Sequence, residues 1–230
     1  TETSRDGDTW SFDVKTNGPA ITLSSKGTVA NPTGPNPEVT GTVNANLSDL
    51  SIFSELANQR LSGSLRLDAS GQASADLADF AIEATATGTN VRTGIAEIDT
   101  ALAGALSADI KAMRDGDAIR IETANFLSNL VSASATGALG PVGSAINLEA
   151  RLANVAPFVP GFSGAATVDG TVTQAENQRL NLSLNATGPG GARAAISGDM
   201  NETATDLALA IDGSAPLGLL NRFIEPRSLS

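Results

Sequence analysis

Two repeated acidic turns are the segments of this chain that most resemble a chemical site. Asp6-Gly7-Asp8 and Asp115-Gly116-Asp117 place two carboxylates around a glycine, as calcium-binding loops do. The sequence has neither the Gly-Gly-x-Gly-x-Asp repeats of calcium-binding β-rolls nor an EF-hand loop that ends in Glu. We therefore interpret both segments as solvated hairpin turns, because Asp-Gly dipeptides favour two-residue hairpin loops.

A second acidic pair, Glu97 and Asp99, has the residue types of a glycosidase site. Two carboxylates on or near a short helix more often form its wet face, and no aromatic platform accompanies this pair. The chain has no His, Cys or Tyr, so a Ser-His-Asp triad and a Cys nucleophile are both impossible. We expect no enzyme activity, no catalytic residues, no cofactor and no metal site.

Composition narrows the possible partners. The formal net charge is −11, and the 14 Lys and Arg residues form no patch, which argues against nucleic-acid binding. No run of 18 apolar residues occurs, so nothing in this sequence is expected to span a bilayer. Because the chain starts and stops within its pattern, we expect it to be a segment of a longer protein.

The chain repeats itself in a fixed order. Arg5-Asp6-Gly7-Asp8 recurs as Arg114-Asp115-Gly116-Asp117, and Gly27-Thr28-Val29 recurs as Gly137-Ala138-Leu139 and again as Gly198-Asp199-Met200. Repeats of this kind are typical of stacked units that share one long core. We predict a single elongated β-repeat segment over residues 1–230, with units at approximately 5–71, 72–113, 114–172 and 173–230.

Period-2 alternation of apolar and polar residues dominates the chain and predicts about a dozen strands. One side of each strand is apolar and the other polar, which is typical of an antiparallel sheet that is solvated on one side. Four segments break this alternation, at 47–56, 91–102, 155–164 and 215–224. We expect short helical plugs there that cap strand edges, the first with an apolar stripe of Leu50, Phe53 and Leu56 and a cap at Ser48 or Asp49. Docking of a partner on these plugs is the alternative.

Four groups of residues resemble one protein family. They are Leu-Ser-Asp-Leu-Ser-Ile-Phe-Ser-Glu-Leu-Ala at 47–57 with Leu-Ser-Gly-Ser-Leu at 61–65, Arg-Thr-Gly-Ile-Ala-Glu-Ile-Asp at 92–99, Val-Ala-Pro-Phe-Val-Pro-Gly-Phe-Ser-Gly at 155–164, and Leu-Leu-Asn-Arg-Phe-Ile-Glu-Pro-Arg-Ser-Leu at 219–229. Together they resemble the middle of the TamB family, within the AsmA-like group of bridge-like lipid-transfer proteins. The resemblance covers essentially all 230 residues.

The resemblance implies a fold, a location and partners. Family members are anchored in the inner membrane of Gram-negative bacteria, and their β-rich body crosses the periplasm as an open, U-shaped trough called a β-taco. They are linked to phospholipid movement and to outer-membrane protein assembly, and the full-length protein meets the outer-membrane barrel TamA. We therefore expect a mainly β, elongated sheet curled into an open groove that binds phospholipid acyl chains. Edge pairing with nascent outer-membrane protein strands is a further expected interaction.

The apolar strand faces are the candidate lipid site. Many of their residues are Ala, which leaves room for an acyl chain, and each buried methylene contributes about 0.8 kcal/mol. Two alternatives are an ordinary closed sandwich and the structural stalk of an adhesin or autotransporter passenger with a filled β-helix core. The positions expected to line the groove are Trp10, Phe12, Val14, Val43, Leu65, Leu67, Phe80, Ile82, Leu106, Ile110, Ile119, Ile121, Leu148, Leu152, Val168, Val172, Leu182, Leu184, Leu207 and Leu209.

Overall fold

The computed structural model describes residues 1–140, 144–175, 179–201 and 205–215. The chain divides into two compact units, Thr1–Gly140 and Pro141–Ser230. Both units are mainly β, as the alternation predicts. The division into four sequence repeats stays a prediction.

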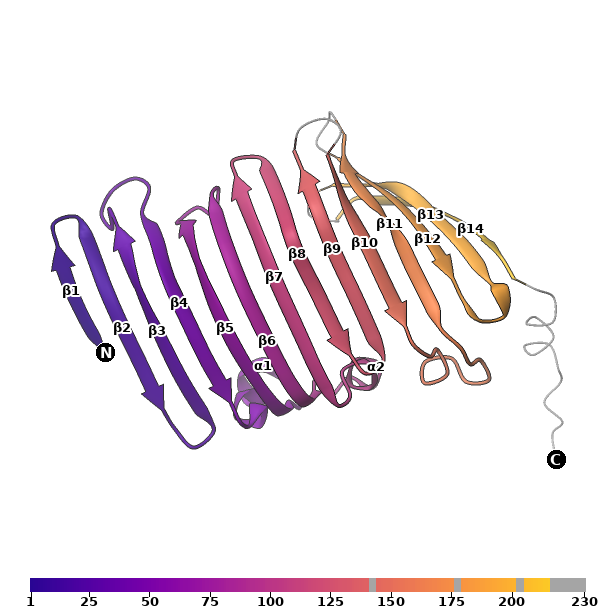
Figure 1. Ribbon diagram of the computed structural model, residues 1–230, viewed down its shortest axis with the longest axis horizontal. Coiled ribbons are helices and arrows are strands. Elements are labelled where there is room, and N and C mark those ends of the chain that lie inside the picture. The colour runs from indigo at the N-terminus through magenta and orange to yellow at the C-terminus, as the bar shows by residue number, and fades with distance from the viewer. Residues whose placement is uncertain (141–143, 176–178, 202–204, 216–230) are drawn as a thin grey trace. The chain divides into compact units, whose positions relative to one another are not determined.

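The first unit is a meander of nine strands, in which the order in the sheet follows the order in the chain (Figure 1). Each neighbouring pair is antiparallel, as expected for short connections between successive strands. The strands are β1 (Glu2–Asp6), β2 (Thr9–Asn17), β3 (Ile21–Ala30), β4 (Glu38–Leu47), β5 (Ser62–Ser74), β6 (Phe80–Arg92), β7 (Ala105–Asp115), β8 (Ala118–Ser128) and β9 (Val131–Leu139).

The second unit contains five strands, and they too pair antiparallel in chain order. A one-turn 3-10 helix, η2 (Pro189–Gly191), connects the third of these strands to the fourth. The strands are β10 (Ala145–Leu152), β11 (Ala166–Gln174), β12 (Leu180–Thr187), β13 (Arg193–Met200) and β14 (Leu207–Ser214).

The repeated Arg-Asp-Gly-Asp segments are two-residue hairpin turns, as predicted. Gly7 joins β1 to β2 at φ 57°, and Gly116 joins β7 to β8 at φ 55°, a left-handed conformation that glycine adopts at little cost. In both turns the arginine Nε donates a hydrogen bond to the glycine carbonyl, over 3.0 Å from Arg5 and 2.8 Å from Arg114. The two sequence copies thus build the same local structure.

Helices occur in the first two predicted plugs. The first holds η1 (Leu50–Phe53) and α1 (Ser54–Ala57), and the second holds α2 (Ala96–Ala101); both lie at the same end of the first unit (Figure 1). Asp49 caps η1, because its Oδ1 accepts a hydrogen bond from the Ser51 amide. The predicted apolar stripe is wrong: Leu50 is buried, whereas Leu56 is 86% exposed. The segment splits into a 3-10 turn and one α-turn, which rotates Leu56 away from Leu50.

The third predicted plug contains no helix. Residues 153–165 form turns, in which Val155 accepts hydrogen bonds from the amides of Phe158 and Val159. Pro157 and Pro160 lack the amide protons that a helix needs, and Gly161 adopts φ 88°. The fourth predicted plug, at 215–224, lies outside the described residues except for Ala215.

Candidate functional site

The strand registers bring all twelve predicted positions of the first unit onto one face of its sheet. Directly paired residues of an antiparallel sheet share a face, and successive residues of a strand alternate between faces. One cross-strand row therefore runs through Trp10, Val29, Val39, Ala73, Phe80, Arg114, Ile119 and Leu139. The same registers, including the bulge in β8, place the other predicted positions on this face, namely Phe12, Val14, Val43, Leu65, Leu67, Ile82, Leu106, Ile110 and Ile121.

The eight predicted positions of the second unit also share one face of their sheet. Rows across the sheet join Ile146, Val172, Leu182, Gly198 and Leu209, and likewise Leu148, Gly170, Leu184, Ile196 and Ile211. Leu152 pairs with Ala166, Val168 with Ala150, and Leu207 with Met200 on the same side. We call these two surfaces the apolar faces of the first and second units.

Large side chains on the apolar faces are uncovered. Trp10 is 45% exposed, Ile82 39% and Ile110 37%, and Leu207, Leu209 and Ile211 are exposed in the second unit. Among the described residues the buried apolar side chains are Leu50, Ala112, Ile146 and Val172, and none of the larger side chains is fully buried. A closed sandwich would bury these side chains between two layers. Within each unit the described strands form a single sheet, so the apolar residues of that sheet remain available to a partner or ligand.

Glycines on the apolar faces mark crowded positions in the backbone. Gly41 on β4 pairs directly with Gly27 on β3 and with Gly71 on β5. A Cβ atom at Gly71 would lie 2.4 Å from the Ala81 carbonyl oxygen, and one at Gly41 would lie 2.8 Å from that of Lys26. Groups converge on the inner side of a bend, and glycine within a strand is typical of such bends. The apolar side of the first sheet is thus crowded in the way that an inner side of a local bend is.

The second unit has the same feature. A Cβ atom at Gly170 would lie 2.1 Å from the Ser183 carbonyl oxygen, and one at Gly198 would lie 1.9 Å from that of Ala208. Both glycines lie on the apolar face and pair with leucines, Gly170 with Leu184 and Gly198 with Leu182 and Leu209. The Gly27, Gly137 and Gly198 copies noted in the sequence therefore occupy equivalent places, opposite a large apolar residue of the preceding strand.

The opposite face of the first sheet is polar and solvated. Lys111 Nζ lies 2.8 Å from Glu122 Oε2, and the hydrogen bond from Lys111 holds the pKa of the Glu122 carboxyl below its usual value. Arg66 and Asn44 donate to Asp68, and the Arg66 hydrogen bond lowers the pKa of that carboxyl. These exposed pairs contribute little to stability. They keep this face charged at neutral pH, which leaves the apolar face as the candidate for hydrophobic binding.

The second plug closes one end of the apolar face of the first unit. Ser128, which pairs with Leu106 on that face, donates its hydroxyl proton to the Ala101 carbonyl at the end of α2. The Asp99 carboxylate accepts hydrogen bonds from the amide and the hydroxyl of Thr93. The hydrogen bond from the Thr93 amide is the main cause of the lowered pKa of Asp99. Asp99 thus has a structural role at the start of this segment, which supports the interpretation of Glu97 and Asp99 as a helix surface.

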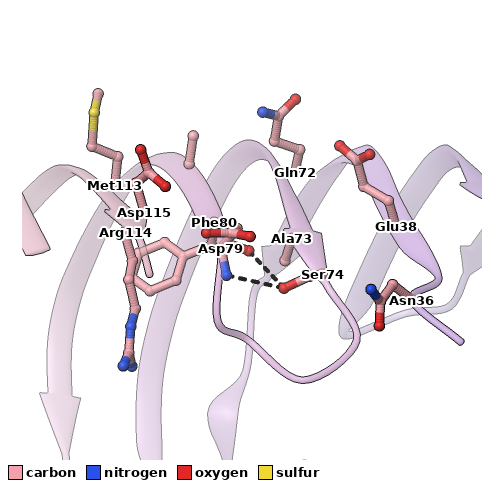
Figure 2. Close-up of a pocket in the computed structure, with 11 residues that line it drawn as sticks. Asn36, Glu38, Gln72, Ala73, Ser74, Asp79, Phe80, Met113, Arg114 and Asp115 are labelled. Carbon is pink, nitrogen blue, oxygen red and sulfur yellow. Dashed lines mark hydrogen bonds between the residues drawn. The ribbon is translucent and has the colours of Figure 1, made fainter. Parts of the chain in front are cut away.

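A cavity of about 510 Å³ lies near the hairpin end of β5 to β7. Figure 2 shows Gln72, Met113 and Glu38 on one side of the ribbon and Phe80 and Arg114 on the other. The Asp79 carboxylate accepts a hydrogen bond from the Gly116 amide over 2.9 Å. The Ser74 hydroxyl accepts a hydrogen bond from the Asp79 amide and donates one to the Asp79 carbonyl. The registers place Glu38, Gln72 and Met113 on the polar face, so the cavity spans the hairpin end between that face and Arg114 on the apolar face.

Two features of the site were missed by reasoning from the sequence. The first is that Arg5 and Arg114 lie on the apolar face. Each is followed directly by an Asp, so the alternation of the sequence only weakly indicated which of the two residues faces the apolar side. The second is the crowding at the glycines, since the sequence showed the glycines recurring but not what lies beside them. Within the described residues, no three or more acidic side chains are grouped so that they could hold a metal ion. No helix in that part of the chain has the length and apolarity needed to cross a membrane.

Comparison with known proteins adds no assignment: no family model and no curated protein matches this chain.

Proposed function

We propose that the apolar faces bind the acyl chains of phospholipids. The observation that carries this proposal is the presence of two sheet faces with large apolar side chains that no described layer covers. Contiguous exposed apolar surface of this kind marks an interaction site in soluble proteins. Among the described paired positions, the apolar face of the second unit carries no charged residue, which is consistent with a hydrocarbon ligand.

Binding of a hydrocarbon chain needs no directional contact. A chain of about 16 methylenes that leaves water gains on the order of 12 kcal/mol before entropy losses, at about 0.8 kcal/mol per methylene. Similar small apolar residues along each row provide similar binding energies from strand to strand. Such a surface allows a chain to move without a deep trap, which suits transport better than storage.

We propose that the apolar faces line a groove in the functional protein. The crowded glycines support it, because crowding of this kind on the apolar side is what the inner side of a bent sheet is expected to have. The trough of the TamB family is the model for this shape. In this proposal the chain is a periplasmic segment of a TamB-like bridge, anchored in the inner membrane through the full-length protein and joined through it to TamA.

Strand addition is the second interaction in this proposal. Among the described residues β14 pairs only with β13, and all eight of its residues are exposed. An open edge can accept an extended strand through main-chain hydrogen bonds, and alternating apolar residues of a nascent outer-membrane strand would match Leu207, Leu209 and Ile211. A β-helix stalk is the less favoured function, since its coils pair in parallel and every described pair here is antiparallel.

Trp10 provides a direct test, because it is the only Trp in the chain and lies on the apolar face of the first unit. Phosphatidylcholine with brominated acyl chains should quench Trp10 fluorescence, since bromine quenches on contact. The same lipid without bromine is the control for a change in environment. Lack of quenching at lipid concentrations that saturate other lipid-transfer proteins would contradict acyl-chain binding by the first unit.

Arginine substitutions separate the two faces. Ile121→Arg should reduce the quenching at least tenfold, because a charge in contact with hydrocarbon is poorly solvated. Asn125→Arg is the matched control, since Asn125 lies on the same strand but on the polar face. In the second unit the matched pair is Leu182→Arg and Ser183→Arg, measured by retained phospholipid. Equal effects of the two substitutions in a pair would contradict a face-specific site.

A further inference from the structure

Two arginines interrupt the apolar faces. Among the paired strand positions of the described residues, Arg5 and Arg114 are the only charged residues that the registers place on either apolar face. A charge on such a face is costly unless water or a partner solvates it. Each of the two is the first residue of an Arg-Asp-Gly-Asp hairpin, so both copies of the repeat place an arginine on the apolar face.

Each arginine is held in the same way at the rim of the face. Arg5 pairs directly with Trp10 and Arg114 with Phe80, so an aromatic residue lies beside each on the apolar side. The Nε of each donates to the glycine carbonyl of its own turn. That bond fixes the guanidinium while its terminal NH groups, which have no hydrogen-bond partner among the described protein atoms, are free to donate outward.

Acidic residues lie close to each arginine. Asp6 and Asp8 follow Arg5 in the same hairpin, and all three residues are exposed. The Asp79 carboxylate accepts a hydrogen bond from the amide of Gly116, whose carbonyl accepts from Arg114. A hydrogen bond from Ser74 lowers the pKa of the Asp76 carboxyl, and the charge of Arg114 lowers it further. Each rim therefore offers one cation and two nearby carboxylates, next to apolar surface. This arrangement disfavours a lipid with net negative charge and is complementary to a head group that carries a phosphate and an ammonium.

We propose that Arg5 and Arg114 bind the phosphate of a zwitterionic phospholipid, such as phosphatidylethanolamine, whose acyl chains lie on the apolar face. The guanidinium donates hydrogen bonds to the phosphate oxygens, and the neighbouring carboxylates accept from the ammonium group. The site rests on the proposed function, because the chains supply most of the affinity and the rim selects the head group. It also gives the lipid a direction, with its head at the hairpin end of the strands.

Head-group selection tests this site. The protein is incubated with vesicles of equal parts phosphatidylethanolamine and phosphatidylglycerol, separated from them, and extracted for mass spectrometry. The wild-type chain should retain the zwitterionic lipid over the anionic one by about tenfold, since a hydrogen bond to a charged group is worth roughly a factor of ten or more. The double variant Arg5→Gln/Arg114→Gln should retain about tenfold less of the zwitterionic lipid, because the phosphate loses its guanidinium donors.

Arg66→Gln/Arg120→Gln is the matched control, because it removes the same charge from the polar face. It should retain as much phosphatidylethanolamine as the wild type does. A brominated long-chain alcohol, which has no phosphate, should quench Trp10 equally in wild type and Arg5→Gln/Arg114→Gln. That result would show that the two arginines act on the head group and not on binding of the hydrocarbon chain.

Three results would overturn the inference and leave acyl-chain binding in place. They are a wild-type preference for phosphatidylglycerol, unchanged retention of phosphatidylethanolamine in Arg5→Gln/Arg114→Gln, and displacement of the lipid by millimolar inorganic phosphate, which would indicate a site for the free ion. The first of these needs no variant, so it holds even where a substitution disturbs the hairpin. Failure of both the lipid and the alcohol to bind the wild type would instead contradict the proposed function.

Discussion

Replacement of Gly71 by alanine tests whether the glycines hold the sheet bent toward its apolar side. The added Cβ would lie 2.4 Å from the Ala81 carbonyl oxygen and 3.1 Å from the Ile82 Cα. Both neighbours are backbone atoms, so a change of side-chain rotamer cannot relieve the contact. Overpacking of this kind costs about 1–3 kcal/mol, and the strand must flatten to reduce it. We therefore expect Gly71→Ala to lower the free energy of unfolding by about 2 kcal/mol.

Gly18→Ala is the matched control in the same unit. Its Cβ would lie 3.5 Å from Ile21 Cγ2, an ordinary van der Waals contact, so the expected change is within about 0.5 kcal/mol. Urea unfolding followed by Trp10 fluorescence gives both values from the midpoint at constant slope. Equal stability of Gly71→Ala and Gly18→Ala would refute the reasoning, because it would mean that the strand can accept a side chain without strain.

Two further predictions concern the plugs at the end of the first unit. Leu50→Ala should lower the free energy of unfolding by about 2 kcal/mol or more in urea, because Leu50 is 8% exposed, whereas Leu56→Ala should change it by less than about 0.5 kcal/mol. Asp99→Asn should destabilise the protein at neutral pH, because the native pKa of this carboxyl is below its ordinary value of 3.8. The stabilisation is complete above the ordinary value and is lost as the pH falls through the native pKa, so urea midpoints of wild type and variant should converge below about pH 4. If the urea midpoints converge at a higher pH, or do not converge at all, Thr93 does not hold the Asp99 carboxylate.

The strands and their faces could be predicted from the sequence because period-2 alternation reports directly on which side chains share a face. Val43 and Leu65, for example, are far apart in the chain, yet each was assigned to the apolar side from its neighbours alone. The hairpins at Gly7 and Gly116 were predictable for a local reason, since the Asp-Gly dipeptide sets the turn geometry within two residues.

The plugs were predicted less well because their structure depends on packing. The spacing of Leu50 and Leu56 fits an α-helix, but a 3-10 turn at its start places the two side chains on different sides. Residues 155–164 resemble the other plugs in composition, yet two prolines in that segment remove the amide donors that a helix requires. The prolines were visible in the sequence and should have excluded a helix.

The site itself was predictable as a set of apolar positions, but not as a surface. Whether Trp10 and Ile82 are covered depends on which layers the chain forms, and no local pattern reports that. The rim arginines needed the strand register, because Arg114 alternates with Asp115 and either could have faced the apolar side.

Co-purified lipid tests the central claim most directly. The segment is expressed in the periplasm of a Gram-negative host, purified without detergent and extracted with organic solvent, and the extract is analysed by mass spectrometry. Bound phospholipid in stoichiometric amounts, reduced in Ile121→Arg/Leu182→Arg and retained in Asn125→Arg/Ser183→Arg, is the result that the account predicts. A lipid-free protein that still shows exposed apolar faces, or equal lipid in both double variants, would contradict it.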